Sequence, residues 1–109
     1  MYRNLYVNAN LIKRTTEKAI LFEVLNDENY GNFSFWCPKS LTKRGCCNGI
    51  YYVAIDVPDE FVFTVTNFQV DRNDSNAIIN TKTKETAREF IAMMRRYDEE
   101  VRRLAKIEL

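Results

Sequence analysis

The sequence contains no histidine among its 109 residues, and this absence removes much ordinary active-site chemistry. Without an imidazole the chain lacks the commonest general base, the usual partner of a nucleophilic serine or cysteine, and a common metal ligand. Carboxylate pairs such as Asp56 with Asp59 or Glu60 fall at a strand end and turn, where solvated acids are normal. We therefore expect no catalytic residues, and a protein that is not an enzyme.

Cysteine is also sparse, and its three positions favour neither a disulfide nor a metal site. Cys46 and Cys47 are adjacent, and Cys37 is the third. Neighbouring cysteines form a bridge only with strain. Structural zinc sites use four ligands in paired spacing, which three thiols without a CxxC motif cannot supply. The sequence therefore predicts three free thiols, no bound metal and no cofactor.

Neither sign of charge is in excess, because 16 basic residues face 15 acidic residues and the net charge is +1. Proteins that hold nucleic acid usually carry a basic excess, so any electrostatic partner must contact a local patch. The chain also lacks an apolar run of membrane-spanning length and the pattern of a signal peptide. These absences predict a cytoplasmic protein with no membrane contact.

The hydrophobic content of 46% and the aromatic content of 13% predict one folded domain over residues 1–109. Alternation of apolar and polar residues predicts strands up to about residue 80. The expected strands are residues 5–12, 19–25, 33–37, 50–57 and 61–70, with an edge strand at 77–79. A change of phase predicts a bulge near Asn67, and the segments 40–49 and 71–76 are predicted to be loops.

From about Thr83 the apolar period changes to steps of three and four, which predicts a helix over residues 83–109 capped by Thr83. Two roles stay open for the apolar seam of this helix. In the first, the seam packs on the sheet along its whole length. In the second, the C-terminal half of the helix, with Val101, Leu104 and Ile107, overhangs the sheet and binds a partner or a second copy. The fold class expected is α+β: a curved, barrel-like antiparallel sheet of about five strands with one long C-terminal helix.

The only tryptophan, Trp36, lies near the end of a predicted strand that Pro38 terminates. Basic residues follow it in the next segment, and tryptophan and arginine are common interface anchors. We predict that Trp36, Lys39, Lys43 and Arg44 lie together at one end of the sheet and contribute to partner binding. The alternative is that Trp36 closes the open end of a barrel and the basic segment is solvated.

Aromatic residues near basic ones also fit single-stranded nucleic acid, where bases stack on rings and cations contact phosphates. Tyr51 and Tyr52 follow the basic segment on a predicted strand, and Tyr52 joins the predicted binding residues. A second basic cluster contains Lys13, Arg14 and Lys18. The lack of a basic excess argues against this partner.

Three segments together resemble a pattern found in small proteins of bacteriophages and mobile elements: residues 16–24, 35–40 and 55–61. The most distinctive part of the pattern is a strand end with tryptophan, proline, lysine and serine, as in residues 36–40. The sequence departs from the pattern at Cys37, where an aliphatic residue is usual, and at Phe61, where tryptophan is commoner.

Some small phage proteins of this size are anti-defence factors, including anti-CRISPR proteins, which mostly bind a nuclease or its complex without chemistry. The resemblance therefore implies a non-enzymatic phage or mobile-element protein in the cytoplasm of a bacterial host. Its expected partner is a host defence nuclease, such as a CRISPR–Cas effector or its RNA or DNA complex, which it inhibits. The alternative function is a small single-stranded nucleic-acid-binding accessory protein.

Overall fold

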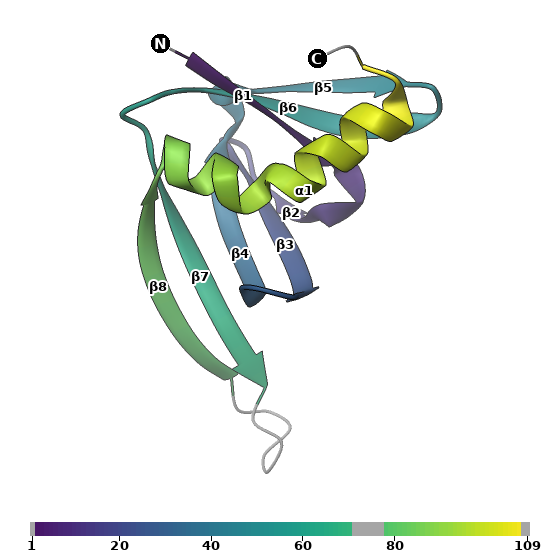
Figure 1. Cartoon of the computed structure of the whole chain (residues 1–109). Coiled ribbons are helices and arrows are strands. Elements are labelled where there is room, and N and C mark those ends of the chain that lie inside the picture. Colours follow the sequence, from purple (N-terminus) through teal and green to yellow (C-terminus); the bar gives the residue numbers. More distant parts are fainter. Residues whose placement is uncertain (1, 71–77, 108–109) are drawn as a thin grey trace.

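A computed structural model of the chain describes residues 2–70 and 78–107, which form two antiparallel sheets and one C-terminal helix (Figure 1). The described strands are β1 (Tyr2–Asn8), β2 (Ile12–Thr15), β3 (Ala19–Asp27), β4 (Gly31–Pro38), β5 (Thr42–Cys47), β6 (Ile50–Pro58), β7 (Val62–Val70) and β8 (Ile78–Thr86). Two short 3-10 helices, η1 (Ala9–Leu11) and η2 (Lys39–Leu41), join strands, and the C-terminal helix is α1 (Ala87–Ala105). The predicted α+β class is confirmed.

The strands are divided between a three-stranded sheet, in the order β1-β6-β5, and a five-stranded sheet, in the order β2-β3-β4-β7-β8. The chain passes from one sheet to the other three times, through η1, through η2 and through the turn after Pro58. The sheets do not close on themselves, so the expected barrel is at most a loose description.

The described residues form eight strands where the sequence predicts about five, because a predicted loop contains a strand and the first predicted strand is divided. The predicted loop at 40–49 contains η2 and β5, which pairs with β6 from Thr42 to Cys47. The predicted first strand is divided into β1, η1 and β2. Both unexpected strands, β2 and β5, lie at sheet edges and carry few apolar residues, so their alternation is weak.

Three phenylalanines join α1 to the inner face of the five-stranded sheet. The ring of Phe90 on α1 stacks on Phe63 of β7 with 4.1 Å between ring centroids, and it meets Phe35 of β4 edge-on at 4.6 Å. All three side chains are buried. Together with the buried residues of β1, β3 and β6 they form one continuous core between the sheets and the helix.

The second half of α1 follows the free edge of β1 and crosses towards the β5–β6 hairpin (Figure 1). The backbone N–H of Tyr6 donates to Asp98 Oδ1 at 2.7 Å, and Asn48 Nδ2 donates to the carbonyl of Leu104 at 3.0 Å. Val101 is only 1% exposed. Of the two roles left open for the apolar seam, packing against the sheet is the one observed, and the overhang is wrong because the three-stranded sheet reaches the second half of the helix.

The helix begins at Ala87 and not near Thr83, because residues 83–86 continue β8 against β7. Thr86 is the N-cap, and its side chain and that of Glu89 form a reciprocal capping box. At the other end Lys106 adopts a left-handed conformation with φ of 57° and closes the helix. The described helix has 19 residues, shorter than the stretch predicted.

The bulge expected near Asn67 is absent from the described pairing, since β7 pairs with β8 residue by residue from Val62 to Val70. Asn67 instead takes a core-side position opposite Phe33, and its amide donates to the carbonyl of Tyr30 at 3.1 Å. The expected edge strand near 77–79 is confirmed from Ile78 onward, while Ala77 and the predicted loop at 71–76 lie outside the described residues.

A buried carboxylate ties the β3–β4 hairpin to the helix. Asp27, which is 8% exposed, accepts hydrogen bonds from Tyr97 Oη at 2.6 Å and from Arg96 at 3.0 Å. The backbone N–H groups of Asn29 and Tyr30 also donate to it. Burial by itself would raise the pKa of Asp27, but these hydrogen bonds and the Arg96 charge outweigh burial, and the pKa lies below its usual value of 3.8.

We expect the Asp27→Asn variant to lower the free energy of unfolding at pH 7 by about 1–3 kcal/mol, because a buried charged acceptor is lost. A lowered pKa means that the carboxylate stabilises the fold above about pH 4 and that this contribution is lost as the pH falls further. Urea unfolding at a series of pH values should show the difference from the parent protein shrinking below pH 4. A difference independent of pH would contradict this role.

Candidate binding surface

The outer face of the five-stranded sheet is opposite to the face that α1 covers, and Trp36 lies near its centre. Strand pairing places Arg14 of β2 beside Leu21 of β3, and Leu21 beside Trp36 of β4. On the same face of the neighbouring hairpin, Thr64 of β7 pairs with Lys84 of β8. We call this line of side chains across the sheet, Arg14, Leu21, Trp36, Thr64 and Lys84, the outer row.

A shallow hollow of about 410 Å³ lies beside Trp36 on this face. It is lined by Ala19, Trp36, Pro38, Phe61, Val62, Thr64, Thr66 and Lys82. Trp36 is 43% exposed, and Val62 is also exposed. Trp36 therefore does not close the end of a barrel; it projects outward while its neighbours Phe35 and Cys37 point into the core.

Cations lie on both edge strands of this sheet, and one of them, Lys82, lines the hollow. A register shift between Ile12 and Arg14 in β2 leaves Lys13 near Glu23, with 2.5 Å between Lys13 Nζ and Glu23 Oε2. On β8, Lys82 and Lys84 alternate with threonines and share the outer face with Thr66 and Thr64. Within residues 2–70 and 78–107, Arg14, Lys82 and Lys84 have no acidic partner within 4 Å.

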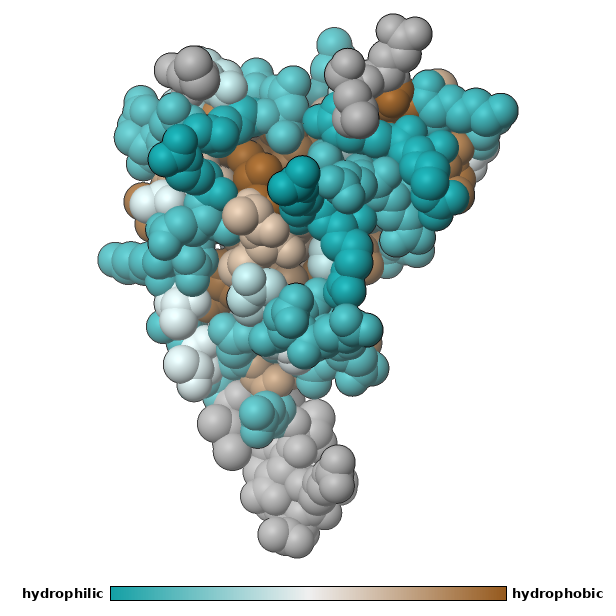
Figure 2. Space-filling view, in the orientation of Figure 1, coloured by the Kyte–Doolittle hydropathy of each residue, from teal (hydrophilic) through white to brown (hydrophobic). Residues whose placement is uncertain are grey.

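Sequence reasoning noted Lys13 and Arg14 as a basic cluster but missed Lys82 and Lys84, because the segment around them was placed at the start of the helix. Its alternation of lysine and threonine over residues 81–84 is the signal of a strand with one charged face. The opposite side of the molecule carries α1. Figure 2 shows the side that carries α1, where hydrophilic residues surround a small apolar area.

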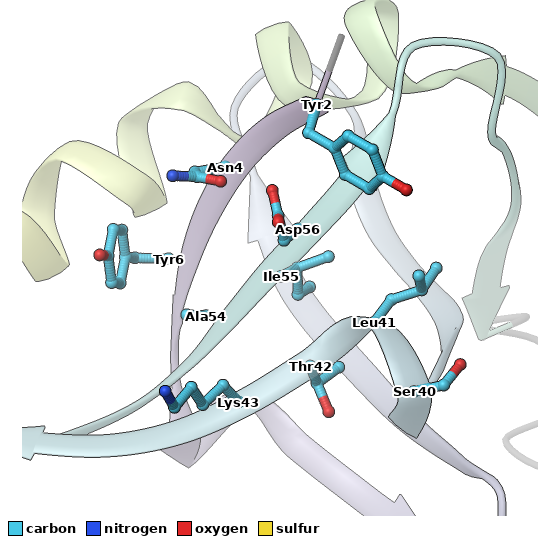
Figure 3. A pocket seen from close by; sticks show the side chains of 10 residues that line it. All are labelled: Tyr2, Asn4, Tyr6, Ser40, Leu41, Thr42, Lys43, Ala54, Ile55 and Asp56. Carbon is cyan, nitrogen blue, oxygen red and sulfur yellow. The ribbon is translucent and has the colours of Figure 1, made fainter.

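Lys43 lies on the other sheet, where it lines a second hollow of about 430 Å³ with residues that include Tyr2, Asn4, Tyr6 and Asp56 (Figure 3). The floor of this hollow is Ala54, which stands between Tyr6 of β1 and Lys43 of β5 in the register of the sheet. It contains one acidic and one basic side chain, so it has no excess of either charge.

Tyr52 and Arg44 occupy the same sheet. The Tyr52 ring meets Tyr6 edge-on at 5.2 Å and is half-buried. It lies over Gly45, where a Cβ atom would come within 2.5 Å of the ring. Gly45 therefore lies in a strand and not in a loop, and its lack of a side chain leaves room for the Tyr52 ring. Arg44 pairs with Val53, on the face of β5 opposite to Lys43.

The predicted cluster of Trp36, Lys39, Lys43 and Arg44 is therefore not formed as one surface, because β4 and β5 belong to different sheets. Lys39 lies in η2, where its backbone N–H donates to the carbonyl of Lys18 at 2.8 Å and fixes the crossing between the sheets. Val101 belongs to the buried core, and Leu104 is half-buried beside Asn48.

The cysteines also differ in environment. Cys37 is completely buried on β4, and burial raises the pKa of its thiol to about 12, whereas Cys46 and Cys47 are exposed near the end of β5. Within the part of the chain that the structure describes, no group of three or more histidine, cysteine or acidic side chains is placed to hold a metal ion.

We expect two of the three thiols to react quickly with a thiol reagent such as DTNB in the native protein, because only exposed thiols with an accessible thiolate attack it. Cys37 should react only after unfolding in urea. Peptide mapping after brief alkylation identifies the modified residues. Rapid modification of Cys37 in the folded protein would contradict the burial described.

Comparison of the chain with protein-family models, with curated proteins and with solved structures finds no match. In the described residues, no helix combines the length and apolar character needed to cross a membrane.

The exposure of Trp36 leads to a prediction about stability. Trp36→Ala should lower the free energy of unfolding by about 1–2 kcal/mol, because only part of the ring leaves an apolar environment. Phe90→Ala is the matched comparison and should cost about 3–5 kcal/mol, the usual effect of emptying a buried aromatic site. Urea denaturation measures both. An equal loss in the two variants would show that Trp36 is part of the core.

Proposed function

We propose that this chain is a non-enzymatic binding protein and that the outer face of the five-stranded sheet is its binding surface. The observation that supports this most strongly is an exposed tryptophan between cations on both edge strands. Monomeric proteins seldom leave large apolar side chains grouped on one face unless that face contacts something. Partly exposed tryptophan flanked by arginine and lysine is typical of the residues that dominate binding energies.

The proposed partner is a host defence nuclease, such as a CRISPR–Cas effector or its RNA or DNA complex. The support for this class of partner is the resemblance of residues 16–24, 35–40 and 55–61 to proteins of bacteriophages and mobile elements. Inhibition would follow from occupation of a surface that the nuclease needs, and it requires no chemistry from this chain.

The outer row accounts for how such binding would work. Trp36 and Leu21 lose contact with water when a partner covers them, which favours association. Arg14 and Lys84 lie at opposite sheet edges, where they attract an acidic surface and fix its orientation on the sheet. The helix is not needed at the interface, because its apolar seam is already buried.

The experiment is a cleavage assay in which purified CRISPR–Cas effectors act on target DNA with increasing amounts of this protein. We expect one effector to be inhibited, and Trp36→Ala to weaken inhibition about 30-fold or more, since an anchor residue contributes about 2 kcal/mol or more. Tyr2→Ala, which removes an exposed aromatic from the other sheet, is the matched control and should inhibit normally.

Equal inhibition by Trp36→Ala and the parent protein would place the binding surface elsewhere. Absence of inhibition across effectors of several types would remove the proposed partner class.

A further inference from the structure

We infer that the outer face of the five-stranded sheet binds a single strand of nucleic acid. The inference rests on the proposed function, because it names the chemical class that this same surface contacts, whether free or as part of a nuclease complex. Three properties of the surface lead to it: the order of the side chains across the sheet, the charge of the edge strands, and the hollow beside Trp36.

The outer row places one aromatic ring between two cations, as a strand that stacks a base on the ring and contacts a cation with a phosphate on each side requires. The outer row begins with the cation Arg14, passes through Leu21 and Trp36, and ends at the cation Lys84. With about 4.8 Å between neighbouring strands, its ends are about 19 Å apart. A span of this length suits a short site of about four nucleotides, at the lower end of the range for single-strand-binding folds.

The positive charge of the surface favours an anionic partner such as phosphate over a partner that is neutral or carries both charges. The outer row and its neighbour Lys82 supply three cations that have no acidic partner in the described part of the chain. The acid of this face, Glu23, already pairs with Lys13. The local excess of positive charge on this face therefore exists although the net charge of the chain is only +1.

The hollow provides a place for a base. Trp36 forms part of its wall, and Thr64, Thr66 and Lys82 add hydrogen-bonding groups beside the ring. Stacking on an exposed aromatic ring is available to every base, but only when the base is not enclosed in a duplex. A duplex would bring phosphates to the edge cations and leave Trp36 without a base, so the geometry favours single strands.

The hollow on the three-stranded sheet lacks this combination. There Lys43 is accompanied by the exposed carboxylate of Asp56, which repels phosphate. The side of α1 facing solvent carries acidic Glu99 and Glu100 among its arginines. The outer face of the five-stranded sheet is therefore the surface best suited to a single strand.

The test is fluorescence anisotropy with a labelled oligothymidylate of about 12 nucleotides, a length within the range of single-strand sites. The same label on a DNA duplex of equal length is the comparison. We expect the single strand to bind more tightly than the duplex at 50 mM salt. Three phosphate contacts predict a slope of log affinity against log salt of about −2.

Two variants separate stacking from charge. Trp36→Ala should weaken binding about 5- to 150-fold and leave the salt slope unchanged, because it removes stacking alone. Lys82→Glu with Lys84→Glu should weaken binding and bring the slope close to about −0.7, since two phosphate contacts are lost. Lys82→Gln with Lys84→Gln is the milder variant and should change the slope in the same direction.

The matched controls lie away from the outer face. Arg88→Glu with Arg103→Glu makes the same change of charge on exposed positions of α1, and Tyr2→Ala removes an exposed aromatic from the other sheet. Both should bind oligothymidylate like the parent protein. Circular dichroism and urea unfolding establish that each variant is folded.

Failure of the folded parent protein to bind oligothymidylate at 50 mM salt would overturn the inference, as would equal losses in the α1 double variant and the β8 double variant. If oligothymidylate does not bind while Trp36→Ala still abolishes nuclease inhibition, the surface contacts protein and the proposed function stands alone. If oligothymidylate binds through Trp36 and no nuclease is inhibited, the inference stands and the proposed partner is wrong.

Discussion

Phe90 of α1 lies against Phe63 and Phe35, and the arrangement of both sheets depends on this contact. The three rings fix the first half of the helix to the inner face of the five-stranded sheet. The direction of the helix then brings Asp98 to the free edge of β1, where it accepts the N–H of Tyr6. No backbone ladder joins the two sheets in the described residues, and the helix connects them instead.

The position of α1 on the inner side of the sheets determines which sheet faces remain exposed to solvent. The inner faces of both sheets are covered by α1 and by each other, and the seam that ends in Val101 is buried. None of the described residues forms a second layer over the outer faces. Of the two, the outer face of the five-stranded sheet carries Trp36 and the edge cations, so the packing of the core leaves the most distinctive surface of the chain accessible.

Local sequence patterns predicted the central strands well, because alternation is clear where one face is buried. Phe33, Phe35 and Cys37 alternate with Ser34 and Trp36, and this pattern already places Trp36 opposite the core. The edge strands β2 and β5 were missed, since an edge strand is held by pairing with a neighbour and needs few apolar residues of its own. Thr86 with Glu89 three residues later has the capping-box pattern, which Thr83 lacks, and the pairing of β8 with β7 excludes Thr83 as the N-cap.

The proposed binding surface could not be predicted from the sequence, because it depends on register. Arg14, Trp36 and Lys84 are far apart in the chain and share a row only when β2, β3, β4, β7 and β8 are aligned. Lys43 is closer to Trp36 in sequence than Lys84 is, yet the crossing at η2 takes it to the other sheet. Proximity in sequence was therefore a poor guide to which cations accompany the tryptophan.

The most direct measurement uses the intrinsic fluorescence of Trp36, which is the only tryptophan in the chain and lies at the centre of the proposed surface. Tryptophan emission is followed while unlabelled oligothymidylate is added to the parent protein. A base that stacks on the ring should quench the emission with a midpoint equal to the dissociation constant found by anisotropy. Saturated binding with unchanged Trp36 emission would show that the strand lies on another surface.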